Sequence, residues 1–146
     1  YFSTFPDEAG GWGAYLPTAD WLWDPDNCQW YSAHHTGSTF AVTYDPGVSV
    51  SDRSAAYAAE GYDGQTTSRY TVFTLESGEQ NTLVYLYGAK DGCFAVTIHW
   101  PHGEDQTDAS GYNPYLQSHC EGQSLKQIAD SFTPLDDNGT ALEQTP

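Results

Sequence analysis

Residues 81–101 read NTLVYLYGAKDGCFAVTIHWP, and this stretch decides the fold. Apolar side chains recur at every second position along both halves, and that period is typical of strands, because successive side chains leave a pleated backbone on opposite faces. Between the halves, Lys90-Asp91-Gly92 supplies a turn in which Gly can adopt a positive φ. We therefore predict a β-hairpin, whose second strand carries an apolar row that needs a covering layer: Phe94, Val96, Ile98 and Trp100.

A helix with one apolar face is predicted near the end of the chain, over residues 124–132. Its apolar residues recur at the i, i+3, i+4 and i+7 spacing that places side chains on one face of a helix. Ser124 and Gln127 have the spacing of a capping box. We predict that this face packs on the apolar row of the hairpin, after a long irregular loop over residues 101–123. The residues of the face are Leu125, Ile128, Ala129 and Phe132.

The remaining elements are expected to be short and to alternate with turns that contain Gly, Pro, Asn and Asp. Alanines favour a helix after residue 50, with Ser51 as its cap and Gly61 just beyond its end. The predicted elements are a strand or helical turn over residues 19–23, a hairpin of residues 28–35 and 39–45, a helix over residues 51–60 and a strand over residues 69–75.

This order of elements predicts one domain of the α+β class. Antiparallel hairpins that are interrupted by two helices favour an antiparallel β-sheet with the helices packed on one face. The chain of 146 residues suits a single core. We assign residues 1–134 to this domain and residues 135–146 to a polar C-terminal tail.

Three of these segments resemble the Mog/PsbP-like α+β family, which includes secreted members of the bacterial lipoprotein type. They are the strand Phe40-Ala41-Val42-Thr43-Tyr44, the long hairpin over residues 82–100 and the terminal helix over residues 125–132. The resemblance implies a Mog/PsbP-like sandwich of sheet and helices. It also implies a non-enzymatic role, because members of that group share no catalytic signature.

The charge of the chain is strongly acidic, with twenty Asp and Glu against four Lys and Arg, a formal net charge of −16. Four scattered cations cannot neutralise a phosphate backbone, so we expect no nucleic acid partner. No apolar run approaches ~20 residues, so we expect no membrane insertion within the chain. We predict a secreted or lipid-anchored protein on the extracytoplasmic side of the cell envelope. Any lipid anchor would lie upstream of Tyr1, and the partner would be a protein or a small molecule.

Four tryptophans near the start of the chain are candidate ligand-binding residues. Exposed in a groove, these rings would stack on a carbohydrate or a peptide, whereas large aromatic side chains more often cover a core. The four are Trp12, Trp21, Trp23 and Trp30.

Histidines and carboxylates carry the enzymatic alternative, a hydrolase or metal-dependent enzyme. His34, His99, His102 and His119 could converge with an acidic side chain as a metal site. His99 and His102 have the two-residue gap of some zinc ligands, but Pro101 interrupts it and the other histidines are distant in sequence, so their meeting depends on the fold. The alternative is that they are surface or strand-face histidines. No nucleophile elbow or phosphate-binding glycine loop occurs, so we predict no catalytic residue and no cofactor. The favoured function is therefore non-enzymatic binding.

Three cysteines leave room for one disulfide. We predict a bond between Cys93 and Cys120, which would close the long loop before the terminal helix, and leave Cys28 alone. Pairing of Cys28 with either of the others stays open, because connectivity depends on the approach of the two Cα atoms. Three buried thiols in a reducing compartment are a further alternative.

Overall fold

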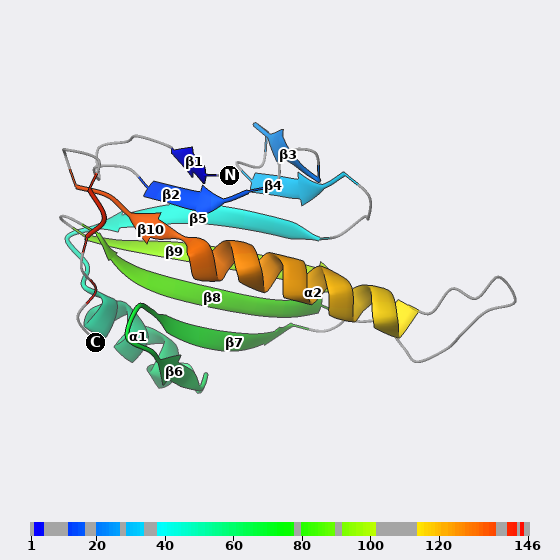
Figure 1. Cartoon of the computed structure of the whole chain (residues 1–146). Helices are drawn as coiled ribbons and strands as arrows, with labels where there is room; N and C mark the ends of the chain where they lie inside the picture. The colour runs from blue at the N-terminus through cyan, green and yellow to red at the C-terminus, as the bar shows by residue number, and fades with distance from the viewer. Residues whose placement is uncertain are drawn as a thin grey trace, which may run out of the picture.

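The computed structural model describes residues 2–4, 12–16, 20–26, 29–33, 38–77, 80–89, 92–101, 114–136, 140–142 and 144. The chain is built on a seven-stranded antiparallel sheet in the order β3-β4-β5-β9-β8-β7-β6 (Figure 1). Its strands are β3 (Trp21–Asp24), β4 (Gln29–Ser32), β5 (Thr39–Pro46), β6 (Gly64–Thr66), β7 (Thr71–Ser77), β8 (Gln80–Ala89) and β9 (Gly92–Pro101).

A smaller three-stranded sheet and two helices complete the described part of the chain. The small sheet has the order β1-β2-β10 and lies beside α2 in Figure 1. Its strands are β1 (Phe2–Thr4), β2 (Trp12–Tyr15) and β10 (Thr133–Pro134), and the helices are α1 (Val50–Ala59) and α2 (Pro114–Ser131).

The predicted hairpin of residues 81–101 is confirmed, since β8 and β9 pair along their whole length. Its glycine serves a different purpose from the predicted one, because the positive φ angles among the described glycines belong to Gly47 and Gly61. At Gly92 a Cβ atom would collide with the backbone carbonyl of Asp45 on β5. Gly is therefore required there by the close approach of two strands.

The predicted packing of the terminal helix on the sheet is also confirmed. Phe132 is fully buried, and its ring centroid lies 5.4 Å from that of Phe94. The apolar residues of both elements share one core: Leu125, Ile128, Ala129 and Phe132 from the end of the helix, and Phe94, Val96, Ile98 and Trp100 from β9.

The helix α2 begins earlier than predicted, at Pro114, so the prediction of an irregular loop up to residue 123 is wrong. Proline suits the first turn of a helix, where its missing N–H would have no partner. Gly122, which reads as a loop signal, lies inside α2 against the ring of Trp100. A Cβ atom there would come within 2.8 Å of that ring, so the glycine allows helix and sheet to approach closely.

The predicted α+β class with both helices on one face is wrong. The described part of the chain has ten strands and two helices, and it is a β-rich fold. The two helices lie on opposite faces, because alternate residues of β8 and β9 belong to separate cores. The face of the sheet that is turned away from α2 carries its own apolar row, and α1 covers this row. Its residues are Val84 and Leu86 on β8 and Cys93 and Ala95 on β9.

The helix α1 forms close to its predicted place. The hydroxyl of Ser49, not that of Ser51, caps it by accepting a hydrogen bond from the Asp52 N–H at 3.0 Å. Gly61 follows its end with a φ of 94°, as predicted. Val50 and Tyr57 face the sheet, and this packing fixes the helix beside β7 and β8.

The C-terminal residues return to the domain. Leu142 N–H donates to the carbonyl of Pro134 at 2.9 Å, and Leu135 forms a β-bridge with Ala141. The side chain of Gln144 then bonds to β8. The described residues of this segment are therefore hydrogen-bonded to the rest of the fold. Within the described ranges, neither helix has the length and apolar character needed to cross a bilayer.

Candidate functional site

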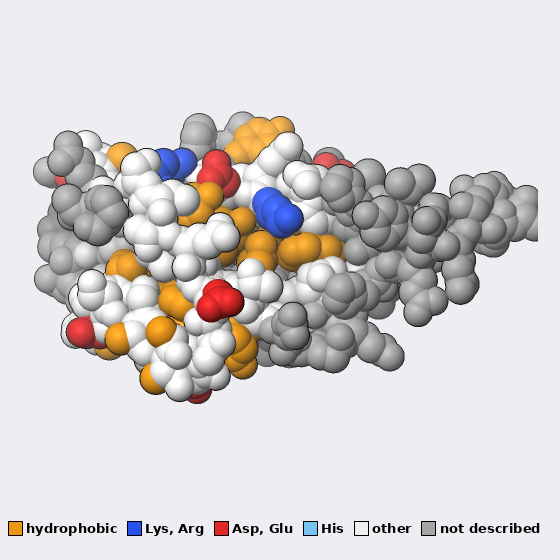
Figure 2. Space-filling model, turned by 90° about the horizontal axis from the view of Figure 1, so that it is seen from below, with side chains coloured by type: hydrophobic (Ala, Val, Ile, Leu, Met, Phe, Trp, Pro, Cys, Tyr) orange, Lys and Arg blue, Asp and Glu red, His pale blue; other side chains and the backbone are white. Residues whose placement is uncertain are grey.

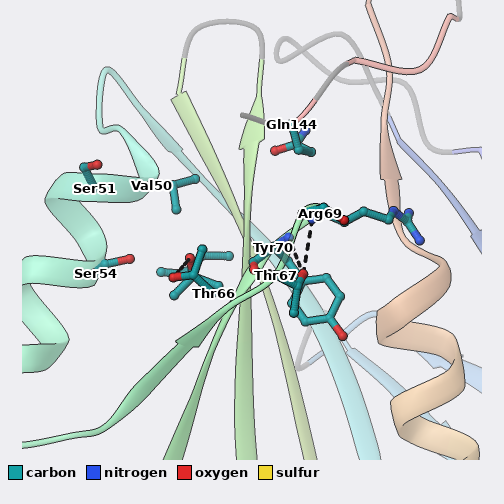
Figure 3. A pocket seen from close by; sticks show the side chains of 11 residues that line it. Val50, Ser51, Ser54, Thr66, Thr67, Arg69, Tyr70 and Gln144 are labelled. Carbon is teal, nitrogen blue, oxygen red and sulfur yellow. Dashed lines mark hydrogen bonds between the residues drawn. The ribbon is translucent and has the colours of Figure 1, made fainter. Parts of the chain in front are cut away.

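A cavity of about 240 Å³ lies between α1, the turn that joins β6 to β7, and β8 (Figure 3). Val50, Ser51 and Ser54 of α1 form one wall, and residues 66–71 form the opposite wall. Leu86 of β8 adds an apolar surface, and the Gln144 side chain lies at one end of the cavity. The chain places these residues together because α1 packs on one face of the sheet, against β7, β8 and β9, and the β6–β7 hairpin forms the neighbouring edge of that sheet.

Seven of the lining side chains carry a hydroxyl group. Thr66 and Thr71 hydrogen-bond to each other at 3.2 Å, and the Thr67 hydroxyl accepts the N–H groups of the turn, including that of Tyr70 at 3.1 Å. The Ser54 hydroxyl is different, because it is buried and has no hydrogen-bond partner. An unsatisfied buried hydroxyl costs about 1–3 kcal/mol, so a bound molecule that satisfied it would gain affinity.

The one cation among the described lining residues does not point into the cavity. The Arg69 guanidinium extends toward the end of α2 (Figure 3), where it donates to the carbonyl of Asp130 at 2.8 Å and that of Phe132 at 3.0 Å. These carbonyls have no partner further along the helix, so Arg69 caps α2. The guanidinium is therefore used in the fold, and the side chains that point into the cavity are neutral.

Tyr70 closes the cavity on the side of α2. Its ring packs on Tyr85 and Tyr87, with centroid distances of 4.9 and 5.6 Å. Burial, followed by a hydrogen bond to the Asp130 carboxylate and the charge of that group, raises the pKa of Tyr70 to about 12. The phenol is therefore neutral at physiological pH and cannot act as a base there.

Gln144 is held in place by two hydrogen bonds to one residue of β8. Its Oε1 accepts the Gly88 N–H at 2.7 Å, and its Nε2 donates to the Gly88 carbonyl at 2.9 Å. A side-chain amide that pairs with both backbone groups of one residue has little rotational freedom. The C-terminal segment thus forms a fixed end wall of the cavity.

The four predicted tryptophans do not form one exposed groove. Trp12 and Trp21 are buried in the α2 core, and Trp30 is partly buried against it. Trp23 is 44% exposed, and its ring lies 4.5 Å from that of Trp30, which stacks on Phe40 at 4.7 Å. Of the four rings, Trp23 is the one that offers substantial surface to a ligand.

Of the four histidines predicted as metal ligands, His99 is the one whose side chain the structure describes. His99 is half-buried on β9, and its Nδ1 is 2.8 Å from the Thr82 hydroxyl. His34, His102 and the side chain of His119 lie outside the described residues. Within the described ranges, no three His, Cys, Asp or Glu side chains are grouped so that they could hold a metal ion.

Cys93 carries a free, buried thiol, which contradicts the predicted disulfide with Cys120. The physical reason is its position: Cys93 lies in the core under α1, whereas α2, which contains Cys120, covers the opposite face of the sheet. Burial raises the pKa of the Cys93 thiol to about 11, so it is neutral and unreactive at physiological pH. Cys28 lies outside the described residues.

The cavity itself was not predicted from the sequence. Its signal is the run Thr66-Thr67-Ser68-Arg69-Tyr70-Thr71, together with Ser51 and Ser54 three positions apart on α1. Hydroxyl side chains are also frequent in turns, so their number alone does not indicate a site.

The face in Figure 2 shows hydrophobic side chains in several groups, with few charged side chains among uncharged polar surface.

No protein-family model matches the sequence, and no curated protein or solved structure matches the chain. The resemblance to the Mog/PsbP-like group therefore stays a prediction made from the sequence.

Proposed function

We propose that the chain is a non-catalytic binding domain that holds a small, neutral, polar molecule in the cavity between α1 and the β6–β7 turn. The observation that carries this proposal is the Ser54 hydroxyl, which is buried in the wall of the cavity without a hydrogen-bond partner. A ligand hydroxyl that met Ser54 would replace the missing bond. Ligand sites typically combine an apolar surface with a few placed polar groups, and this cavity has both.

The neutrality of the cavity determines the class of ligand. Its inward-facing groups are hydroxyls, one amide and two aliphatic side chains, Val50 and Leu86. Hydroxyls both donate and accept hydrogen bonds, whereas a charged ligand would need an opposite charge to offset its lost hydration. Sugars and other polyols have the matching surface, with hydroxyls at the rim and C–H groups between them. We therefore favour a monosaccharide or a polyol of similar size.

The same composition supports binding rather than catalysis. Acid–base and nucleophilic catalysis need a group that titrates near neutral pH or an activated nucleophile. Among the described lining residues the ionisable groups are Arg69, which is bonded to α2, and Tyr70, whose raised pKa keeps it protonated. The hydrolase or metal-dependent enzyme considered from the sequence draws no support from this cavity.

The extracytoplasmic location belongs to this proposal as well. Its support is the acidic, Lys-poor composition, which gives a formal charge of −16. A secreted or lipid-anchored binding domain with this charge would stay soluble through self-repulsion while it takes up a neutral ligand.

Titration with neutral sugars tests the proposed function. Glucose, galactose, mannose, N-acetylglucosamine and glycerol would each be added to the whole chain, with binding followed by calorimetry and by the melting temperature. We expect saturable binding of at least one of them. Ser54→Ala should weaken it about three- to tenfold, the loss expected for one hydrogen bond, and Ser54→Leu should abolish it by filling the space.

The matched control is Ala55→Ser, which places a hydroxyl at an exposed position of the same helix, outside the cavity. It should bind as the unmodified chain does. Absence of saturable binding for the whole panel, or equal affinity in Ser54→Leu, would contradict the proposed function.

A further inference from the structure

The strand β3 forms one end of the seven-stranded sheet. Among the described residues it pairs with β4 on one side and with no strand on the other. The Ala33 N–H donates to the Asp20 carbonyl, so Asp20 and Ala33 form a hydrogen-bonded pair. Along an antiparallel ladder, hydrogen-bonded pairs alternate with pairs whose N–H and C=O groups point away from each other. Leu22 therefore bonds to Tyr31 on β4, and the N–H and C=O groups of Trp21 and Trp23 point outward.

Three hydrophobic side chains beside this edge are exposed, namely Leu22, Trp23 and Tyr31, whereas the side chain of Trp21 is buried in the core. Trp23 is 44% exposed, and its cross-strand neighbour Trp30 supports its ring from behind at 4.5 Å. On the other face, Leu22 and Tyr31 lie directly opposite each other across the ladder, with exposures of 43% and 40%. Exposed hydrophobic side chains on an edge strand are the features that natural sheets usually avoid, unless the edge serves to pair with another chain.

The charged side chains described within or next to β3 are all acidic. Asp20, Asp24 and Asp26 lie within or next to the strand. The cations whose side chains are described lie elsewhere: Arg53 is paired with Asp45, Arg69 caps α2 and Lys126 lies over the ring of Trp100. The edge thus combines free backbone groups, aromatic faces and negative charge. A cation near an indole or phenol face gains from the ring quadrupole as well as from the carboxylates.

We propose that β3 is a docking edge for an extended, lysine- or arginine-rich segment of another protein, which adds to the sheet as an eighth strand. Backbone bonds to Trp21 and Trp23 supply the pairing, as in other cases of strand addition. Alternate side chains of the segment contact Trp23 on one face and Leu22 with Tyr31 on the other. A second copy of this chain does not fit, because it would bring its own three aspartates against these three.

A labelled peptide of alternating lysine and valine, capped at both ends, is the probe, with a glutamate–valine peptide as its charge control. Fluorescence anisotropy should show saturable binding of the lysine peptide, weakened by added salt, and none of the glutamate peptide. The Trp23 N–H points outward and makes no hydrogen bond to β4. Trp23→Pro therefore removes this donor while the hydrogen bonds between β3 and β4 remain. We expect this variant to weaken binding at least tenfold, and Trp23→Ala, which keeps the N–H, to weaken it less.

Amide hydrogen exchange on the unmodified chain separates strand addition from simple contact with the rings. The Trp21 and Trp23 amides should exchange at least tenfold more slowly when the lysine peptide is bound. Unchanged exchange at both amides, equal binding of the glutamate peptide, or wild-type affinity in a folded Trp23→Pro variant would overturn the proposal. A dimer in sedimentation that Trp23→Pro dissolves would show that the occupant is a second copy, and would overturn the assignment to a basic segment.

Discussion

Replacing Phe132 by Ala should remove the side chain that joins the two sheets and α2. Phe132 is fully buried, and its ring contacts three others, with centroids 5.0 Å from Trp12, 4.9 Å from Tyr87 and 5.4 Å from Phe94. Trp12 belongs to the small sheet, and Tyr87 and Phe94 belong to the large one. The cavity left by the ring would therefore lie where three elements meet.

The magnitude follows from these contacts. Truncation of a buried Phe to Ala costs about 3–5 kcal/mol, and each aromatic pair adds about 0.5–1.5 kcal/mol beyond its buried area. We expect a loss near the upper end of that range, about 4–5 kcal/mol. For a slope of about 2 kcal/mol per molar urea, the unfolding midpoint should fall by about 2 M. Equilibrium unfolding in urea measures it, with tryptophan fluorescence and circular dichroism as separate probes.

Tyr15→Ala is the matched control, because Tyr15 is an aromatic residue of β2 that is 45% exposed. Its loss should stay within about 0.5 kcal/mol, the usual range for surface positions. If Phe132→Ala cost less than about 1 kcal/mol, or no more than Tyr15→Ala, the packing of α2 against both sheets would be refuted.

Three further changes probe other parts of the structure. Burial lowers the pKa of His99 below its ordinary value of 6.5, so the unfolded chain takes up a proton first as the pH falls through 6.5. The unmodified chain should then lose stability, relative to His99→Gln, between pH 6.5 and the lower pKa of the folded state. Urea unfolding at a series of pH values measures this. A difference in unfolding free energy between the two proteins that stays constant across this pH range would contradict the prediction. Gly92→Ala should cost about 1–3 kcal/mol through collision with the Asp45 carbonyl, and a neutral result in urea would show that the two strands separate readily. Arg69→Met should cost about 1–2 kcal/mol by uncapping α2, and an unchanged melting temperature would show that the cap adds nothing.

The sequence predicts the centre of this fold because the patterns there have a single physical reading. Strict alternation in residues 92–101 fits a strand, and the spacing of Leu125, Ile128, Ala129 and Phe132 fits one helix face. Two such apolar surfaces in one small domain pack together. The β4–β5 hairpin follows from the same alternation, with Trp30 opposite Phe40.

The second core and the site could not be predicted in this way. Cys93 and Ala95 are too small to indicate a covered face, although they form one with Leu86 under α1. Gly122 reads as a helix breaker until the ring of Trp100 beside it is known. The cavity depends on the distance between α1 and the β6–β7 turn, which neither segment encodes alone.

The ladder between β5 and β9 has a consequence for how the molecule folds. It pairs Thr39 with His99 and Pro46 with Gly92, so it joins segments that are far apart in sequence, whereas only two residues separate β7 from β8 and β8 from β9. Closing a long loop costs entropy before the new contacts repay it, so non-local pairing slows folding. The three-stranded meander of β7, β8 and β9 should therefore form first, and addition of β5 should limit the rate. In stopped-flow refolding, Val42→Ala on β5 should then mainly raise the unfolding rate, whereas Val84→Ala on β8 should slow folding itself.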